Sequence, residues 1–222
     1  MQPEVIPAIL VKTKQELLHR ISQVKDHVPF IQLDIMDGEF VPNKTIGLDD
    51  LLHLPKAKYE FHWMVKDPKK YIERTIGPHL HLVHVETINS DSYFVELEKA
   101  VEKVGGSLGL AINPETPIEK LLELLSKSKL KINQILVMTV HPGFSGQSYI
   151  YEMEQKLKTL RKLYPKINLE VDGGVNQQSI AHAYAAGANI LAAASAIFSS
   201  KEPTIEKAIE SLKKQATSGW HS

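Results

Sequence analysis

The chain of 222 residues, 43% hydrophobic and 23% charged, has the length and composition of a single globular domain covering residues 1–222. Its 26 Lys and Arg residues balance 26 Asp and Glu residues, which excludes a basic field that would attract nucleic acid or an anionic membrane, and no apolar run reaches the roughly 18 residues of a membrane span. The absence of cysteine excludes thiol catalysis, disulfides and cysteine-based zinc sites, and it agrees with the cytoplasmic location that we expect.

Eight short apolar or β-branched runs alternate with longer segments along the whole chain. Their starts recur about every 25 residues, which is the spacing expected for a strand, a loop and a helix. Several runs are apolar on both faces, as is typical of parallel strands covered by helices. The predicted strands are Val5–Val11, Phe30–Asp34, Lys58–Val65, His81–Glu86, Ser107–Ile112, Gln134–Val140, Asn168–Asp172 and Asn189–Ala194.

Between these runs the apolar residues recur at helical spacing. This pattern predicts amphipathic helices, each with one apolar stripe facing the strands. The residues that define the stripes are Leu17, Leu18, Ile21 and Val24, then Ile118, Leu121, Leu122 and Leu125, then Met153, Leu157 and Leu160, and finally Ile205, Ala208, Ile209 and Leu212.

The alternation of eight strands with helices predicts a (β/α)8 TIM barrel. An open doubly wound sheet would show the same alternation, but no GxGxxG motif follows the first predicted strand. We therefore favour the barrel and expect no organic cofactor. In such a barrel the catalytic groups lie at the carboxyl ends of the strands and in the loops that follow them.

Polar side chains occupy the expected ends of three predicted strands. Alternation places Gln32 and Asp34 on one face of the second strand, and His62 stands at a similar height on the third. Asp172 is the last residue of the seventh strand, across the barrel mouth from Asp34. Taken singly, such an aspartate is often a turn or cap residue, and such a histidine a hydrogen-bonded core residue. Their convergence on one rim predicts a functional site.

This set of groups is suited to two related kinds of chemistry. Two opposed carboxylates beside an imidazole can remove a proton from one face of a carbon and return one to the other, as an epimerase or racemase requires. The same groups, Asp34, His62 and Asp172, can also bind a divalent metal that polarises a carbonyl.

Glycine-rich loops follow the sixth and seventh predicted strands, and a serine follows the eighth. Barrel enzymes frequently bind phosphate in this region, where backbone N–H groups point at the anion. The alternative is that these glycines only form turns. The predicted phosphate-binding and substrate-binding residues are Gly143, Ser145, Gly146, Gly173, Gly174 and Ser195.

Two further sets of residues stay open between a structural and a functional role. Met36, Met64 and Met138 end strands two, three and six, where they either fill the core or form an apolar floor under the site. His84 and Glu86 alternate on the fourth predicted strand and either line the mouth or pair within the core.

Read in order, the motifs of the chain resemble those of the ribulose-phosphate 3-epimerase family along nearly the whole sequence. The segments MDGEFVPN and VDGGV carry the most specific part of this resemblance. The matching stretches are residues 7–10, 34–43, 62–68, 83–86, 113–117, 137–140, 142–147, 171–175 and 195–198.

The resemblance implies a barrel that interconverts D-ribulose 5-phosphate and D-xylulose 5-phosphate. Asp34 and Asp172 would be the acid and base and would also bind a divalent metal (Zn, Fe, Mn or Co), together with His62. Asp37 would brace the mouth, and the residues named above for phosphate would hold the substrate. The small phosphorylated sugar would be the main partner, and the resemblance also suggests a homo-oligomer, either a dimer or a hexamer.

The chain departs from the family pattern at four positions, one of which is Ser145 in place of the second glycine of the phosphate loop. The first metal-binding histidine is replaced by Gln32, which offers a carbonyl oxygen but is a poorer zinc ligand than imidazole. Ala8 and Ala194 replace a substrate-contacting serine and a glycine next to the expected phosphate. Three interpretations follow: an epimerase with a weakened or altered metal site, a related aldolase-like or decarboxylase-like enzyme without the metal, and a catalytically silent phosphosugar-binding protein.

Overall fold

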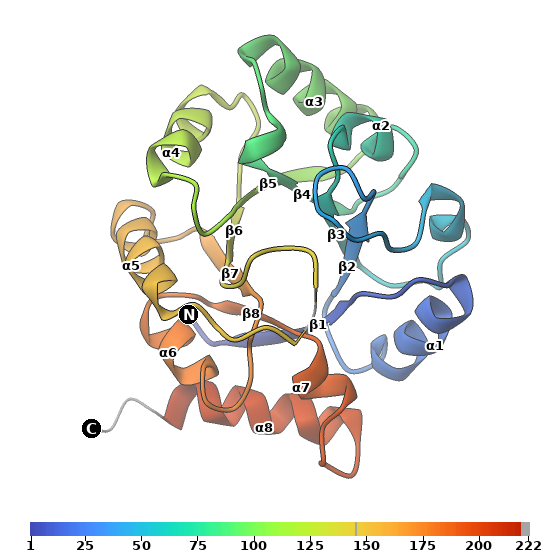
Figure 1. Cartoon of the computed structure of the whole chain (residues 1–222), viewed down its shortest axis with the longest axis vertical. Helices are drawn as coiled ribbons and strands as arrows, with labels where there is room; N and C mark the ends of the chain where they lie inside the picture. Colours follow the sequence, from blue (N-terminus) through green and yellow to red (C-terminus); the bar gives the residue numbers. More distant parts are fainter. Residues whose placement is uncertain (145, 219–222) are drawn as a thin grey trace.

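Eight parallel strands close into a barrel, in which each strand pairs with the next along the chain and β8 returns to β1. The computed structural model describes residues 1–144 and 146–218. Figure 1 shows the strands around the centre and the helices in a ring outside them. The strands are β1 Glu4–Ile9, β2 Ile31–Met36, β3 Tyr59–Met64, β4 Leu80–His84, β5 Ser107–Ile112, β6 Gln134–Met138, β7 Asn168–Asp172 and β8 Ile190–Ala193.

The helices follow the strands and cover the outside of the barrel (Figure 1). None of the helices within the described residues has the length and apolar character needed to cross a bilayer. The α-helices are α1 Lys14–Val24, α2 Pro68–Ile72, α3 Asp91–Lys103, α4 Ile118–Lys127, α5 Glu154–Leu163, α6 Ile180–Ala185, α7 Ser195–Phe198 and α8 Ile205–Ser218. Short 3-10 helices are η1 Leu48–Leu51, η2 Val85–Thr87 and η3 Tyr151–Met153.

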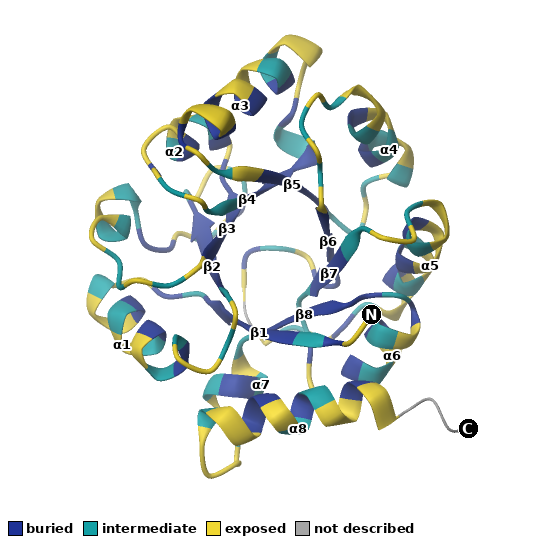
Figure 2. Ribbon diagram, turned by 180° about the vertical axis from the view of Figure 1, so that it is seen from behind, coloured by how far each residue is buried: buried dark blue, intermediate teal, exposed yellow. Residues whose placement is uncertain are grey.

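Local sequence explains where a helix such as α1 begins and which face it buries. The Thr13 hydroxyl oxygen accepts the backbone N–H of Glu16 at 3.2 Å, which caps the first turn. Leu17, Ile21 and Val24 recur at helical spacing and are buried against the barrel. Figure 2 shows this pattern around the ring, with buried strands and helices whose outer faces are exposed.

The prediction of a barrel is confirmed, and all eight predicted strands are present within a few residues of their expected bounds. The fourth strand was placed too long, because β4 ends at His84 and the chain turns into η2 at once. Glu86 therefore lies in a 3-10 turn beyond the strand. This turn brings the Glu86 carboxylate back into hydrogen-bond contact with His84.

Alternation along the strands separates two environments. On β2, Leu33 and Ile35 belong to the core between strands and helices, whereas Gln32 and Asp34 point into the barrel toward His62 and Asp172. Other strands fill the interior with apolar groups such as Leu82, Ala111 and Leu136, or Ile6, Ala8 and Ile190. Polar side chains of β2, β3, β4, β6 and β7 thus stand beside these apolar groups inside the barrel.

Candidate active site

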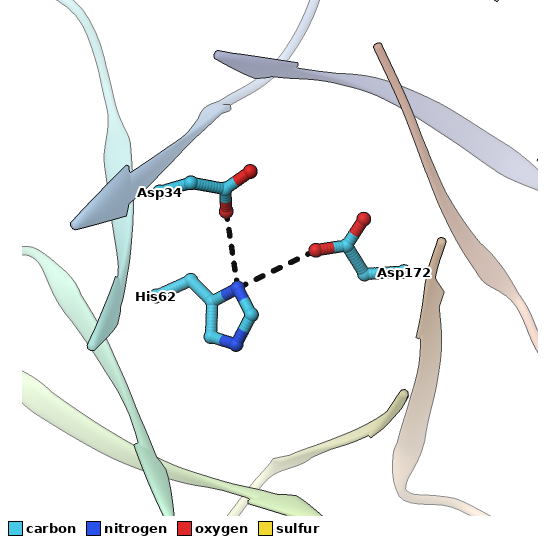
Figure 3. A group of neighbouring side chains, drawn as sticks. All are labelled: Asp34, His62 and Asp172. Atoms are coloured by element: carbon cyan, nitrogen blue, oxygen red, sulfur yellow. Dashed lines mark hydrogen bonds and ion pairs between the residues drawn. The ribbon is translucent and has the colours of Figure 1, made fainter. Parts of the chain in front are cut away.

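The predicted residues Gln32, Asp34, His62 and Asp172 meet inside the barrel. The Gln32 side-chain N–H2 donates to Asp34 Oδ1 and to Asp172 Oδ2, both at 2.7 Å. The His62 Nδ1 atom lies 3.0 Å from Asp34 Oδ1 and 3.4 Å from Asp172 Oδ2. Figure 3 shows the imidazole between the two carboxylates, with both of its dashed contacts made by the same nitrogen.

Strand register explains this convergence. Asp34 and His62 are directly paired between β2 and β3, so their side chains stand at one height. Asp172 ends β7, and parallel strands present their carboxyl ends at the same edge of the barrel. Asp34 and His62, which are neighbours in the sheet, therefore face Asp172 across the interior of the barrel.

The electrostatics of the cluster link the two aspartates through a buried histidine. Burial and the negative charge of Asp172 raise the pKa of Asp34. Burial disfavours the charged form of His62, but hydrogen bonds to Asp172 and Asp34 and the charges of both carboxylates outweigh it and raise its pKa to about 9. Close carboxylates of this kind favour a state in which one holds a proton and the other is ionised.

His84 and Glu86, whose role the sequence left open, extend the cluster away from the cavity. The Nε2 atoms of His62 and His84 lie 2.8 Å apart, and His84 Nδ1 lies 3.1 Å from Glu86 Oε2. The His62 and His84 side chains are fully buried. The two histidines therefore belong to one hydrogen-bonded chain that starts at the aspartates.

A second polar cluster inside the barrel was not predicted. The Gln134 side-chain N–H2 donates to Glu60 Oε2 at 3.1 Å and to Glu170 Oε2 at 2.6 Å, and all three residues are buried. Burial raises the pKa of Glu60 to about 7, and burial together with the charge of Glu60 raises the pKa of Glu170 well above its ordinary value. The sequence signal was available, because Glu60 and Glu170 each precede a predicted site residue by two positions.

The two aspartates and the glycine loops line the same cavity, which has a volume of about 180 Å³. The three strand-end methionines line it as well. Of the predicted phosphate-binding residues, Ser145 lies outside the described residues. The predicted residues that line the cavity are Asp34, Asp172, Met36, Met64, Met138, Gly143, Gly146, Gly173, Gly174 and Ser195.

The loop after β7 adopts a conformation that only glycine accepts easily. Gly173 and Gly174 have φ angles of 113° and 66°. A Cβ atom on Gly174 would lie 2.5 Å from the backbone nitrogen of Tyr149. This loop therefore packs backbone against backbone beside the cavity. Ser195, the first residue of α7, is exposed on the same cavity.

Asp37 lies at the rim, where its carboxylate holds two loops. Its Oδ1 atom accepts the backbone N–H groups of Glu39 and Phe40 at 2.8 and 3.0 Å, and its Oδ2 atom accepts that of Lys66 at 2.7 Å. These hydrogen bonds lower its pKa despite partial burial. Asn43, further along the same loop, donates to the Gly143 carbonyl oxygen at 2.7 Å and so ties it to the loop after β6.

The donor set is compatible with a divalent metal ion. Ligand atoms of Asp34, His62 and Asp172 all lie within 4.8 Å of one another. The Gln32 carbonyl oxygen is buried and has no hydrogen-bond partner among the described residues, but the N–H2 group of this amide faces the two carboxylates, so the oxygen could join the ligands only after the amide turns over. Two carboxylates, one imidazole and one amide oxygen form a set of hard and borderline ligands of the type that divalent first-row metals accept.

Together the fold and the cluster define a class: a (β/α)8 barrel with two opposed carboxylates and a histidine at the carboxyl ends of its strands. Sequence comparison is specific about the kind of barrel. The chain matches the sequence model of the Ribulose-phosphate 3 epimerase family over residues 4–198, and it belongs to this family.

Several relatives are similar over most of their length. The cytoplasmic isoform of ribulose-phosphate 3-epimerase from Oryza sativa subsp. japonica is 38% identical over 179 residues, which cover 78% of this chain and 77% of the relative. The ribulose-phosphate 3-epimerase of Schizosaccharomyces pombe is 33% identical over an alignment 234 positions long, which covers 99% of both chains.

Solved structures of lower sequence similarity share the fold. The KGPDC structure from Streptococcus mutans superposes with a TM-score of 0.73 at 12% identity, covering 99% of this chain and 100% of its own. A 3-hexulose-6-phosphate synthase superposes with a TM-score of 0.67 at 17% identity, covering 96% of this chain and 99% of its own. At such low identities the similarity extends to the barrel alone.

Proposed function

We propose that this protein is an isomerase that interconverts D-ribulose 5-phosphate and D-xylulose 5-phosphate. The observation that carries the proposal is that Asp34 and Asp172 line one cavity together with the glycine loops after β6 and β7. A phosphate held by those loops would leave the carbon end of a short sugar between the two carboxylates. The family relationship supports the same reaction.

The two aspartates act as a matched acid and base at C3 of the sugar. The C3–H bond is next to the C2 carbonyl, so its proton is acidic enough for a carboxylate to remove. The ionised aspartate takes this proton from one face, and the protonated aspartate gives one back to the other face. After one turnover the pair has exchanged protonation states, so the reverse reaction uses the same two groups in exchanged roles.

The environment of the pair suits this exchange. The charge of Asp172 and the burial of Asp34 favour a proton on one of the two groups, which is the state that a two-base reaction needs. The Gln32 amide hydrogen-bonds to both carboxylates and holds them at a fixed separation. The methionines of β2, β3 and β6 give the cavity an apolar wall that limits water access to the planar intermediate.

A divalent ion would be held by Asp34, His62 and Asp172, with the Gln32 carbonyl oxygen as a candidate further ligand. Such an ion, when bound, would supply positive charge that stabilises the negative charge developing on the C2 oxygen. His62 orients its Nδ1 atom toward both carboxylates. Backbone N–H groups of the loops at Gly143, Gly174 and Ser195 would hold the phosphate.

The test is to incubate the protein with ribulose 5-phosphate in D2O and to follow C3 by NMR. We expect deuterium at C3 and the appearance of xylulose 5-phosphate. Loss of a carbon fragment from the sugar would instead indicate an aldolase-like or decarboxylase-like activity. Binding of the sugar without exchange would indicate a silent binding protein. Either of these results would overturn the proposal.

A further inference from the structure

A chain of hydrogen bonds connects the site to an acidic residue that lies outside the cavity lining. His62 Nε2 and His84 Nε2 are 2.8 Å apart, and the two rings stack with centroids 5.0 Å apart. His84 Nδ1 is 3.1 Å from Glu86 Oε2. Both nitrogens of both rings are therefore engaged, His62 on its other side with Asp34 and Asp172.

Glu86 is held in place by groups other than histidine. Its Oε1 atom accepts the backbone N–H of Asn113 at 2.9 Å. Burial opposes its ionisation, but hydrogen bonds from His84, Thr116 and Asn113 outweigh burial and lower its pKa to about 2. Glu86 is thus an anchored carboxylate, which has only acceptor atoms to offer.

The direction of every hydrogen bond in the chain follows from that carboxylate. Because Glu86 only accepts, His84 must carry a proton on Nδ1. A neutral imidazole has one N–H, so His84 Nε2 must then accept, and the donor across the 2.8 Å contact is His62 Nε2–H. Burial and the neighbouring His62 lower the pKa of His84, in agreement with a neutral ring.

From this juxtaposition we propose that Glu86 is a positioning residue, which acts through His84 to fix the tautomer and orientation of His62. With Nε2 committed to donation, His62 presents Nδ1 to the aspartates, and this nitrogen has a lone pair free for a cation whenever it carries no proton. The role rests on the proposed function, since a metal ligand or a proton-holding imidazole needs a defined nitrogen facing the substrate.

The direct test is NMR of the chelator-treated protein with 15N-labelled histidine, which reports the protonated nitrogen of each ring. In the wild type we expect His84 to carry Nδ1–H with a bare Nε2, and His62 to carry Nε2–H. In Glu86→Gln a single amide oxygen cannot accept from both Asn113 and His84. Its N–H2 group should then face His84 Nδ1 and move the His84 proton to Nε2.

The second readout is the affinity for Zn²⁺ and Mn²⁺, measured by competition with a chelator. We expect Glu86→Gln to weaken binding of the ion by about 10–100-fold. A proton on His84 Nε2 removes the acceptor for His62 Nε2–H, and a metal-binding histidine that loses its hydrogen-bond partner usually loses this much affinity. In turnover kcat should fall while KM for the sugar phosphate stays within about twofold, because the phosphate loops are untouched. Glu96→Gln, which removes an exposed carboxylate on α3 paired with Lys69, is the control and should change none of these values.

The possible outcomes separate this inference from the proposed function. A wild type with a proton on His84 Nε2 would overturn the inference even if the variant failed to fold. Unchanged tautomers and unchanged ion affinity in a folded Glu86→Gln protein would overturn it as well. If the tautomers shift as expected but the wild type shows no exchange at C3, the positioning role stands and only the epimerase proposal fails.

Discussion

Gln32 and Asp172, which are 140 residues apart in the chain, are joined by a hydrogen bond of 2.7 Å from Nε2 to Oδ2. The same N–H2 group donates to Asp34 at 2.7 Å. The amide thus cross-links two acidic groups that would otherwise repel each other, while its own buried carbonyl oxygen has no partner in the part of the chain that the structure describes. A buried acceptor without a hydrogen-bond partner costs about 1–3 kcal/mol. Gln32 therefore holds the two carboxylates together while its own carbonyl oxygen lacks a hydrogen bond.

Gln32→His should tighten metal binding at the site. An imidazole at this position adds a nitrogen ligand beside Asp34, His62 and Asp172, and nitrogen suits Zn²⁺ better than an amide oxygen does. We expect the Kd for Zn²⁺ to fall by about tenfold or more, equivalent to about 1.4 kcal/mol per factor of ten. Competition with a chelator measures this value, and the steady-state rate of epimerisation should rise with it.

The control for Gln32→His is Gln155→His, which adds the same imidazole to an exposed position on α5. This variant should bind Zn²⁺ as weakly as the wild type does. Equal Zn²⁺ affinities of Gln32→His and the wild type would show that the site is not a metal site limited by Gln32.

Asp34→Asn and Asp172→Asn should each abolish interconversion of the two sugar phosphates. An amide of the same shape cannot accept the C3 proton, and we expect kcat to fall by about 10³-fold, within the usual range for loss of an acid or base. Each variant keeps one carboxylate, so each should exchange deuterium with no more than one of the two epimers. The epimer that still exchanges should differ between the two variants.

Asp91→Asn, which alters an exposed carboxylate on α3, is the control and should behave as the wild type. Interconversion within tenfold of the wild type in either variant would rule out the two-base mechanism.

The barrel and the position of its mouth were predictable because they depend on local patterns. The predicted runs Phe30–Asp34 and Gln134–Val140 contain enough apolar residues to indicate buried strands, and period-two alternation then places Gln32 and Asp34 on one face. Asp172 could be placed for the same reason, since it ends a predicted strand. Because the barrel is closed, the carboxylates of Asp34 and Asp172 point into one interior and lie near each other.

The hydrogen-bond directions in the interior could not be read from the sequence. The spacing between Gln32 and Asp34 does not predict that the Gln32 N–H2 group donates to both aspartates. Nor does it predict that the Gln32 oxygen has no partner among the described residues. The return of Glu86 to His84 depends on a 3-10 turn of three residues, where propensities have little influence. Such details are set by packing between strands that are distant in sequence.

Glu60 should make the stability of the protein depend on pH. Its pKa is raised from 4.5 to about 7, mainly by burial, so the folded protein binds its proton more tightly than the unfolded chain does. The stabilisation is complete below pH 4.5 and is lost as the pH rises through about 7, with a total on the order of 3 kcal/mol. Glu60→Gln should remove most of this pH dependence, which denaturant unfolding at a series of pH values measures.

The control for Glu60 is Glu102→Gln, which alters an exposed position on α3. The difference in unfolding free energy between this variant and the wild type should stay constant from pH 4.5 to 8. The same constant difference in Glu60→Gln would mean that Glu60 is ionised in the folded protein across this range.

Gly174→Ala should separate the phosphate loop from an ordinary turn when it is compared with Gly105→Ala. Both glycines have positive φ angles, 66° and 75°, so a side chain at either one costs roughly 1–3 kcal/mol of backbone strain. Of these two positions, only Gly174 would bring the new Cβ against backbone, 2.5 Å from the Tyr149 nitrogen, whereas at Gly105 no atom of the described residues lies within 4 Å. The loop after β7 must therefore shift in Gly174→Ala. Backbone N–H groups that shift by a few tenths of an ångström make weaker hydrogen bonds to a bound anion. We expect about a tenfold rise in KM and a matching loss of affinity for inorganic phosphate in this variant alone. If both variants lose stability and both keep the wild-type KM, the glycines after β7 serve the turn and the phosphate binds elsewhere on the rim.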